Sequence, residues 1–150
     1  MKICNDNHLY RSFGKQYSDG IHLGKDYGTF VGDEVRFPYI IKIIDCIYAN
    51  GYGSLNPSTK GYVVFADCEI NGQNYNVNFG HINPQVKKGD IIKPGDIIGT
   101  VASFSNHGEI LPHLHLGVHV GHGIPASPWG YIKNISDLNG WINPVSLGLA

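Results

Sequence analysis

The chain has 150 residues, of which 42% are hydrophobic and 15% are charged. A chain of this size and composition forms one packed core, so we expect residues 1–150 to be a single domain. The formal net charge of -1 provides no field for a polyanion, which argues against nucleic acid as a partner. No apolar run approaches the ~20 residues that span a bilayer, and the first eight residues lack the apolar core of a signal peptide.

Strand-like runs, rich in β-branched and aromatic residues, dominate the middle of the chain. They cover residues 39–48, 61–70 and 75–79. Between the last two, the Asn71-Gly72 pair supplies the positive φ angles of a tight turn and predicts an antiparallel hairpin. Residues 86–99 contain Gly-Asp-Ile-Ile twice, six residues apart, and predict a small β-meander corner. Because sustained 3.6-residue periodicity is missing, we expect a mostly β fold of antiparallel sheets with little helix.

Glycine and proline mark two loops, at residues 50–60 and 121–140. The second contains Trp129 and Tyr131, which could line a substrate subsite, because exposed aromatic rings in loops often serve recognition. Trp141, just beyond it, is expected in the core.

Three cysteines, Cys4, Cys46 and Cys68, form an odd set without C-x-x-C spacing. We expect them to be small buried side chains. A Cys46–Cys68 disulfide is the alternative if the protein works outside the cell.

The motif His113-Leu114-His115 begins a run in which residue types alternate strictly as far as Val120. In a strand, this alternation places His113, His115, Gly117 and His119 on one face and the aliphatic residues on the other. The aliphatic face would pack into a core, and the imidazoles could bind metal or move protons. The alternative is a polar, solvated strand face.

A second histidine, His22, has a carboxylate four residues on, at Asp26, and a turn at Gly24 could aim both side chains at one point. Three protein ligands and a water form the catalytic arrangement of zinc, since the open position lets the ion activate the water. His22, Asp26 and His115 would supply two nitrogens and one oxygen. His81 then stands unassigned at a strand end.

In this order, the motifs resemble the lysostaphin-type zinc endopeptidases, which cut peptide cross-links in bacterial peptidoglycan. The shared pattern comprises Phe13-Gly14, His22-x-x-x-Asp26, Gly28, Gly61-Tyr62-Val63-Val64, Phe79-Gly80-His81, the turn at 86–99, His113-Leu114-His115 and Asn143-Pro144.

The resemblance implies a fold like the duplicated hybrid motif, in which antiparallel sheets form an open groove. It implies that His22, Asp26 and His115 bind one zinc ion, while His81 and His113 are catalytic residues beside the water. One of these two would take the water's proton and the other would stabilise the oxyanion, in an order that the sequence leaves open. It further implies a monomer that acts on peptidoglycan or another peptide in an extracytoplasmic place.

Two features depart from the family pattern. Gly117 occupies a place where the family commonly has glutamate, so a partner that orients the ligand histidine is missing or replaced. The stretch 105–112 replaces the usual Gly/Ser-rich turn and bears on substrate preference. A non-catalytic binding or regulatory domain on the same fold is therefore one alternative function. The turn at 86–99 also resembles lipoyl-type and phosphotransferase carriers, which would leave Asp26 unexplained.

The remaining histidines have no assigned chemistry. His8, His107 and His122 are expected to be solvated. His119 shares the face of His115 but lies ~13 Å along the strand, too far to bind the same ion.

Overall fold

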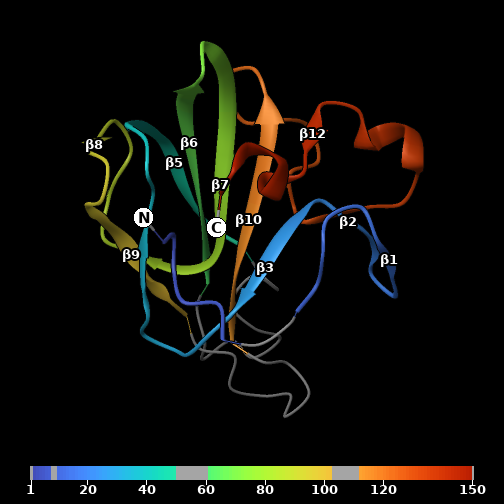
Figure 1. Cartoon of the computed structure of the whole chain (residues 1–150), viewed down its shortest axis with the longest axis horizontal. Helices are drawn as coiled ribbons and strands as arrows, with labels where there is room; N and C mark the ends of the chain where they lie inside the picture. The colour runs from blue at the N-terminus through green and yellow to red at the C-terminus, as the bar shows by residue number, and fades with distance from the viewer. Residues whose placement is uncertain (1, 8–9, 50–60, 103–111, 150) are drawn as a thin grey trace.

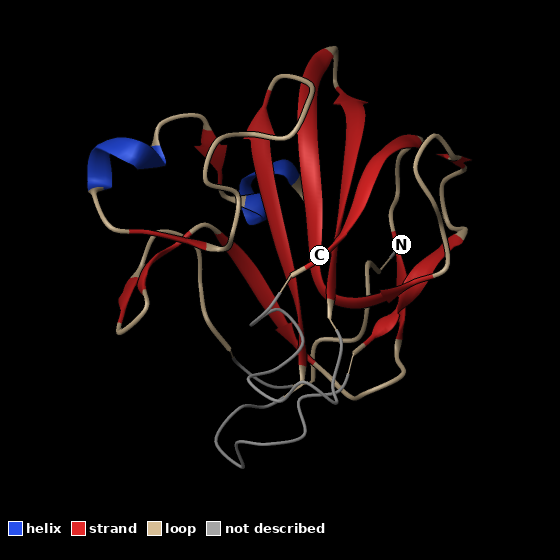
Figure 2. Ribbon diagram, turned by 180° about the vertical axis from the view of Figure 1, so that it is seen from behind, coloured by secondary structure: helices blue, strands red, loops and turns tan. Residues whose placement is uncertain are grey.

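The computed structural model describes residues 2–7, 10–49, 61–102 and 112–149 (Figure 1). Within these ranges antiparallel strands are the main regular structure, and helix is limited to two short 3-10 turns, Ile135–Leu138 and Pro144–Leu147 (Figure 2). The predicted mostly β fold with little helix is confirmed, and the sheets do not close into a barrel. None of the described helical segments has the length and apolar character needed to cross a membrane.

A nine-stranded sheet forms the body of the molecule, in which β10 lies beside the long strand β7 (Figure 1). Its main path runs β12-β10-β7-β6-β5-β8, and β3 pairs with the same edge of β10 as β12 does. β9 joins the far end of β7 and pairs with β4. The bounds are β3 (Gly24–Gly28), β4 (Glu34–Arg36), β5 (Ile41–Tyr48), β6 (Tyr62–Ile70), β7 (Gln73–Pro84), β8 (Ile91–Ile92), β9 (Ile97–Val101), β10 (His113–Val120) and β12 (Trp141–Ile142).

A small three-stranded sheet lies beside the first, in the order β1-β2-β11. Its strands are β1 (Gln16–Tyr17), β2 (Gly20–His22) and β11 (Tyr131–Ile132). The predicted loop at 121–140 is therefore wrong in part, because it contains β11 and a 3-10 turn. β11 is short and pairs with a strand about 110 residues earlier, so no local pattern could indicate it.

The turns between strands form where the sequence predicts them. Asn71 and Gly72 have φ angles of 52° and 80° between β6 and β7, which confirms the predicted hairpin. Gly89 and Gly95, at φ angles of 92° and 86°, precede β8 and β9, so each Gly-Asp-Ile-Ile copy makes a turn and then a short strand. β7 is longer than predicted because its second half pairs with β9.

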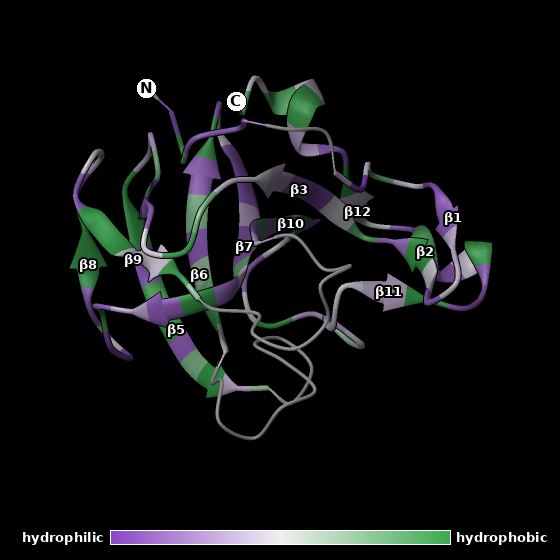
Figure 3. Cartoon of the chain, turned by 90° about the horizontal axis from the view of Figure 1, so that it is seen from below, coloured by the Kyte–Doolittle hydropathy of each residue, from purple (hydrophilic) through white to green (hydrophobic). Residues whose placement is uncertain are grey.

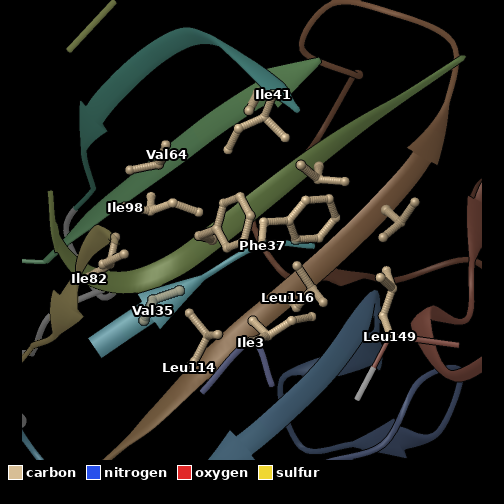
Figure 4. Close-up of a cluster of buried hydrophobic side chains, with 14 of the residues drawn as sticks. Ile3, Val35, Phe37, Ile41, Val64, Ile82, Ile98, Leu114, Leu116 and Leu149 are labelled. Carbon is tan, nitrogen blue, oxygen red and sulfur yellow. The ribbon is translucent and has the colours of Figure 1, made fainter. Parts of the chain in front are cut away.

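One apolar cluster fills the space beneath the main sheet, and Figure 4 shows part of it. It joins Leu114 and Leu116 of β10 to Phe37 and to residues near both ends of the chain, Ile3 and Leu149. Bands of hydrophobic and hydrophilic residues alternate along β5 and β6 (Figure 3), as expected for strands with one face in a core. Burial of each large side chain contributes roughly 1.5–3 kcal/mol, which holds β10 firmly in place.

The cysteines are all free thiols. Cys46 pairs with Val64 and Cys68 with Ile41, near opposite ends of the β5–β6 ladder. A disulfide cannot join positions so far apart, so the Cys46–Cys68 alternative is wrong.

Candidate metal centre

Antiparallel pairing of β3 with β10 brings two distant motifs together. Asp26 lies directly opposite His115 in this ladder, and Gly24 lies opposite Gly117. His22 ends β2, two residues before Gly24. Because side chains alternate along an extended chain, His22, Gly24 and Asp26 share one face. Asp26 pairs with His115, so that face lies on the same side of the sheet as the His115 side chain.

The candidate ligand atoms converge closely. His22 Nε2 lies 3.1 Å from Asp26 Oδ1, and His115 Nδ1 lies 3.1 Å from His22 Nε2 and 3.0 Å from Asp26 Oδ1. One ligand atom from each of the three residues fits within 4.8 Å of the others. Two imidazole nitrogens and one carboxylate oxygen are a donor set that suits zinc and leaves a fourth position open.

These side chains are buried, since His22, Asp26 and His115 expose 0%, 4% and 2% of their surface. The alternative of a solvated strand face is therefore wrong. Gly24 does not form a turn but begins β3, and a Cβ atom there would lie 2.1 Å from the carbonyl oxygen of Leu116. The absence of a side chain at 24 is what allows β3 to approach β10 so closely.

Electrostatics favour the metal-binding forms of two ligands. Burial alone would raise the pKa of Asp26, but hydrogen bonds with His115 and His22 outweigh it and hold the pKa well below its usual range. Asp26 is therefore a carboxylate. Burial lowers the pKa of His115, and the neighbouring Asp26 only partly opposes this effect. His115 is therefore neutral, as a metal ligand must be.

The orientation of His22 is set by groups on its far side. Its Nδ1 lies 3.1 Å from the carbonyl oxygen of Ser12, which can only accept, so Nδ1 carries the proton and Nε2 faces the cluster. Tyr131, directly opposite His22 in the small sheet, packs its ring 5.1 Å from the imidazole. Two neighbours thus fix the tautomer and the ring plane.

His113 and His81 lie on the other side of Asp26. His113 Nε2 is 3.7 Å from Asp26 Oδ2, and its ring is 4.4 Å from that of His81, between centroids. Tyr10 stacks on His113 with the ring centroids 4.2 Å apart. The structure thus brings all five predicted site residues into one cluster, in which the ligand atoms of His22, Asp26 and His115 converge and His81 and His113 lie beside them.

His81 does not end a strand, as the sequence had suggested, but lies within β7. Tyr62 of β6 pairs with Ile82 and Val63 pairs with Gly80, so His81 is the extra residue of a β-bulge. Its φ angle of 62° is left-handed, a conformation that is uncommon for a residue with a side chain. Bulges of this kind re-aim a side chain, here toward His113.

Sequence reasoning missed Arg11. Its Nη1 donates to Asp19 Oδ2 at 2.7 Å and to the Tyr131 hydroxyl oxygen at 2.5 Å, so it braces the ring that packs on His22. No spacing or motif relates residue 11 to residue 131. The two meet because Asp26 N–H donates to the backbone carbonyl of Arg11, while Tyr131 pairs with His22 in the small sheet.

The other aromatic and histidine predictions have mixed outcomes. Trp141 is buried, as expected, and lies edge-on to His119. Trp129 is 45% exposed and packs edge-on against Phe65. His122 is exposed, as expected. His8 and His107 lie outside the described residues.

Solved structures with the same fold were found by comparison. The lysostaphin catalytic domain from Staphylococcus simulans is 22% identical, with a TM-score of 0.58 over 95% of this chain and 90% of that chain. LytU is 24% identical, with a TM-score of 0.60 over 91% and 80%. A zinc-containing peptidase from Vibrio cholerae is 23% identical, with a TM-score of 0.55 over 80% of this chain and 35% of that one.

No protein-family profile matches the sequence, and no curated protein does either. The solved structures nevertheless show that the chain has the fold of lysostaphin-type catalytic domains. The resemblance first seen in its motifs is confirmed at the level of fold.

Proposed function

We propose that residues 1–150 form the catalytic domain of a zinc-dependent endopeptidase that hydrolyses peptide bonds in peptidoglycan, in cross-links or stem peptides. The convergence of His22, Asp26 and His115 beside the pair His81 and His113 carries this proposal. The shared fold with lysostaphin supports it, because that protein is an antimicrobial peptidase. Since peptidoglycan lies outside the cytoplasmic membrane, we place the action of the enzyme there.

One zinc ion fits the cluster, held by His22 Nε2, His115 Nδ1 and an Asp26 oxygen. Zinc in such a site polarises a carbonyl group and lowers the pKa of a water molecule. Asp26 balances part of its charge, while Ser12 and Tyr131 hold His22 in the required orientation.

Proton handling falls to His113 and His81. Each presents an imidazole near the ligands without belonging to the ligand set. A neutral imidazole can accept the proton of the attacking water and later give it to the leaving amine, and an imidazole N–H can stabilise the oxyanion. His113 Nε2 lies 3.7 Å from Asp26 Oδ2, so its imidazole is placed directly beside the proposed ligand cluster.

The test is digestion of purified peptidoglycan by the zinc-loaded chain, with chemical identification of the new amino termini. We expect new amino termini that disappear on chelation and return on addition of zinc. The variant His113→Ala, which keeps all three ligands, is the matched control and should release almost none. A zinc-loaded chain that binds peptidoglycan without cutting any peptide bond would contradict the proposal and favour a non-catalytic binding domain.

A further inference from the structure

Asn78 is a buried polar residue that the proposed mechanism leaves unused. It lies in β7 directly opposite Gly117, and none of its surface is exposed. Among the described residues, neither its Oδ1 nor its Nδ2 has a hydrogen-bond partner. An unpaired buried amide costs about 1–3 kcal/mol, and such groups are rare enough in folded proteins that each calls for an explanation.

The position of Asn78 relates it to the proposed zinc ligand. In the β7–β10 ladder His115 faces Gly80, and the next pair on the same side of the sheet is Gly117 and Asn78. His115 and Asn78 are therefore diagonal neighbours, roughly 7–8 Å apart between backbones and within reach of side chains. The other two residues of these two pairs are Gly80 and Gly117. Because neither has a side chain, nothing from either strand separates the imidazole from the amide.

Steric contacts show which way the amide leans. A Cβ atom at Gly117 would lie 2.7 Å from both Oδ1 and Nδ2 of Asn78, so the amide lies over the bare backbone at 117. A Cβ atom at Gly24, the partner of Gly117 in β3, would lie 3.0 Å from Cε1 of His115. The imidazole and the amide thus border the same space, which the pair of glycines leaves open.

The chemistry of His115 supplies a reason for an amide there. Its Nδ1 faces His22 and Asp26, so zinc would bind at Nδ1 and the neutral ring would carry its proton on Nε2. Metal-binding histidines usually donate this second N–H to an oxygen, which fixes the ring and makes it a better ligand.

We infer that Asn78 is the positioning residue of His115: when zinc binds, its Oδ1 accepts the Nε2 proton, directly or through one water, and so strengthens zinc binding. The inference rests on the proposed function, because it assumes that zinc binds at His115. The inference also explains why residue 117 is glycine, since any side chain at that position would displace the Asn78 amide.

Zinc affinity and metal-free stability separate this role from simple packing. The variant Asn78→Leu keeps the number and branching of the side-chain heavy atoms and removes the polar atoms. We expect its zinc affinity to fall about 10–100-fold, while the metal-free protein is at least as stable as the parent because the unpaired amide of Asn78 is removed. Asn78→Asp, which keeps an acceptor oxygen, should bind zinc with affinity close to that of the parent. Competition with a chelating dye measures the affinity, and urea unfolding the stability.

Asn76→Leu is the matched control, two residues along the same face of β7. Asn76 is also fully buried but donates to Asp67 at 2.8 Å, so this variant should lose stability and keep its zinc affinity. If Asn78→Leu does not fold, Asn78→Ala replaces it with the same expected loss of affinity.

Three outcomes would overturn the inference. The first is that Asn78→Leu, or its replacement, binds zinc as tightly as the parent. The second is that Asn76→Leu weakens zinc binding equally, which would make the effect a general one of the sheet. In both cases a parent chain that binds zinc and cuts peptidoglycan leaves the proposed function intact. A parent chain that binds no zinc would overturn the inference and the proposed function together.

Discussion

The left-handed bulge at His81 predicts an unusual effect of replacing that residue. With φ at 62°, any residue that has a Cβ atom pays a conformational cost of roughly 1–2 kcal/mol there, and glycine does not. His81→Gly and His81→Ala lose the same imidazole and differ by one methyl group. We therefore expect the glycine variant to be the more stable of the two by about 1 kcal/mol, or about five-fold in the unfolding equilibrium.

Urea unfolding of the metal-free variants measures this difference, provided that both show the same dependence on urea. The variants Asn83→Gly and Asn83→Ala give a control. Asn83 lies in the same strand as His81, is exposed, pairs with Thr100 of β9 and has no positive φ angle. There the order should reverse, because glycine in a strand is roughly 0.5–1 kcal/mol worse than alanine. If His81→Ala were as stable as His81→Gly, the bulge would not have this conformation and the aim of His81 at His113 would lose its explanation. Both His81 variants should still bind zinc.

Three further predictions follow from the close fit of β3 to β10 and from burial. Gly24→Ala places a methyl group 2.1 Å from a β10 carbonyl oxygen, so unfolding should show a loss of about 1–3 kcal/mol or more, together with weaker zinc binding; an unchanged stability would disprove the close approach. Asp26→Asn keeps the shape but loses the anionic ligand, so zinc affinity measured by competition should fall by more than about 100-fold, and a smaller loss would mean that Asp26 is not a ligand. Burial raises the pKa of Cys4 and Cys68 to about 12 and that of Cys46 to about 11, so at pH 8 these thiols stay protonated and should react slowly with a disulfide reagent until urea unfolds the chain; a rapidly reacting thiol in the folded protein would contradict this.

What the sequence could predict is the structure that short patterns specify. The alternation of β10 and the Asn71-Gly72 turn depend on neighbouring residues, and both appear in the structure as expected. The grouping of His22, Asp26 and His115 depends instead on the pairing of strands about 90 residues apart. Their spacing alone left that grouping open, and only the ordered set of motifs shared with a known family pointed to it.

What the sequence could not predict arises from contacts between distant segments. The bulge at His81 exists because β7 continues past it to pair with β9, and no feature of residues 78–83 signals an extra residue. Arg11 reaches Tyr131 because the backbone of Arg11 bonds to β3 and Tyr131 pairs with β2. Alternation alone left open whether the histidine face of β10 is solvated, because the segments outside β10 that bury both of its faces are distant in the sequence.

Zinc content tests the central claim most directly. His115→Ala and His113→Ala remove neighbouring imidazoles from the same face of one strand, and both residues lie close to Asp26. Measured by elemental analysis after dialysis, the parent and His113→Ala should each retain one zinc ion per chain, and His115→Ala should retain none. Equal zinc content in the two variants would contradict the division of this pair into one ligand and one proton-handling residue.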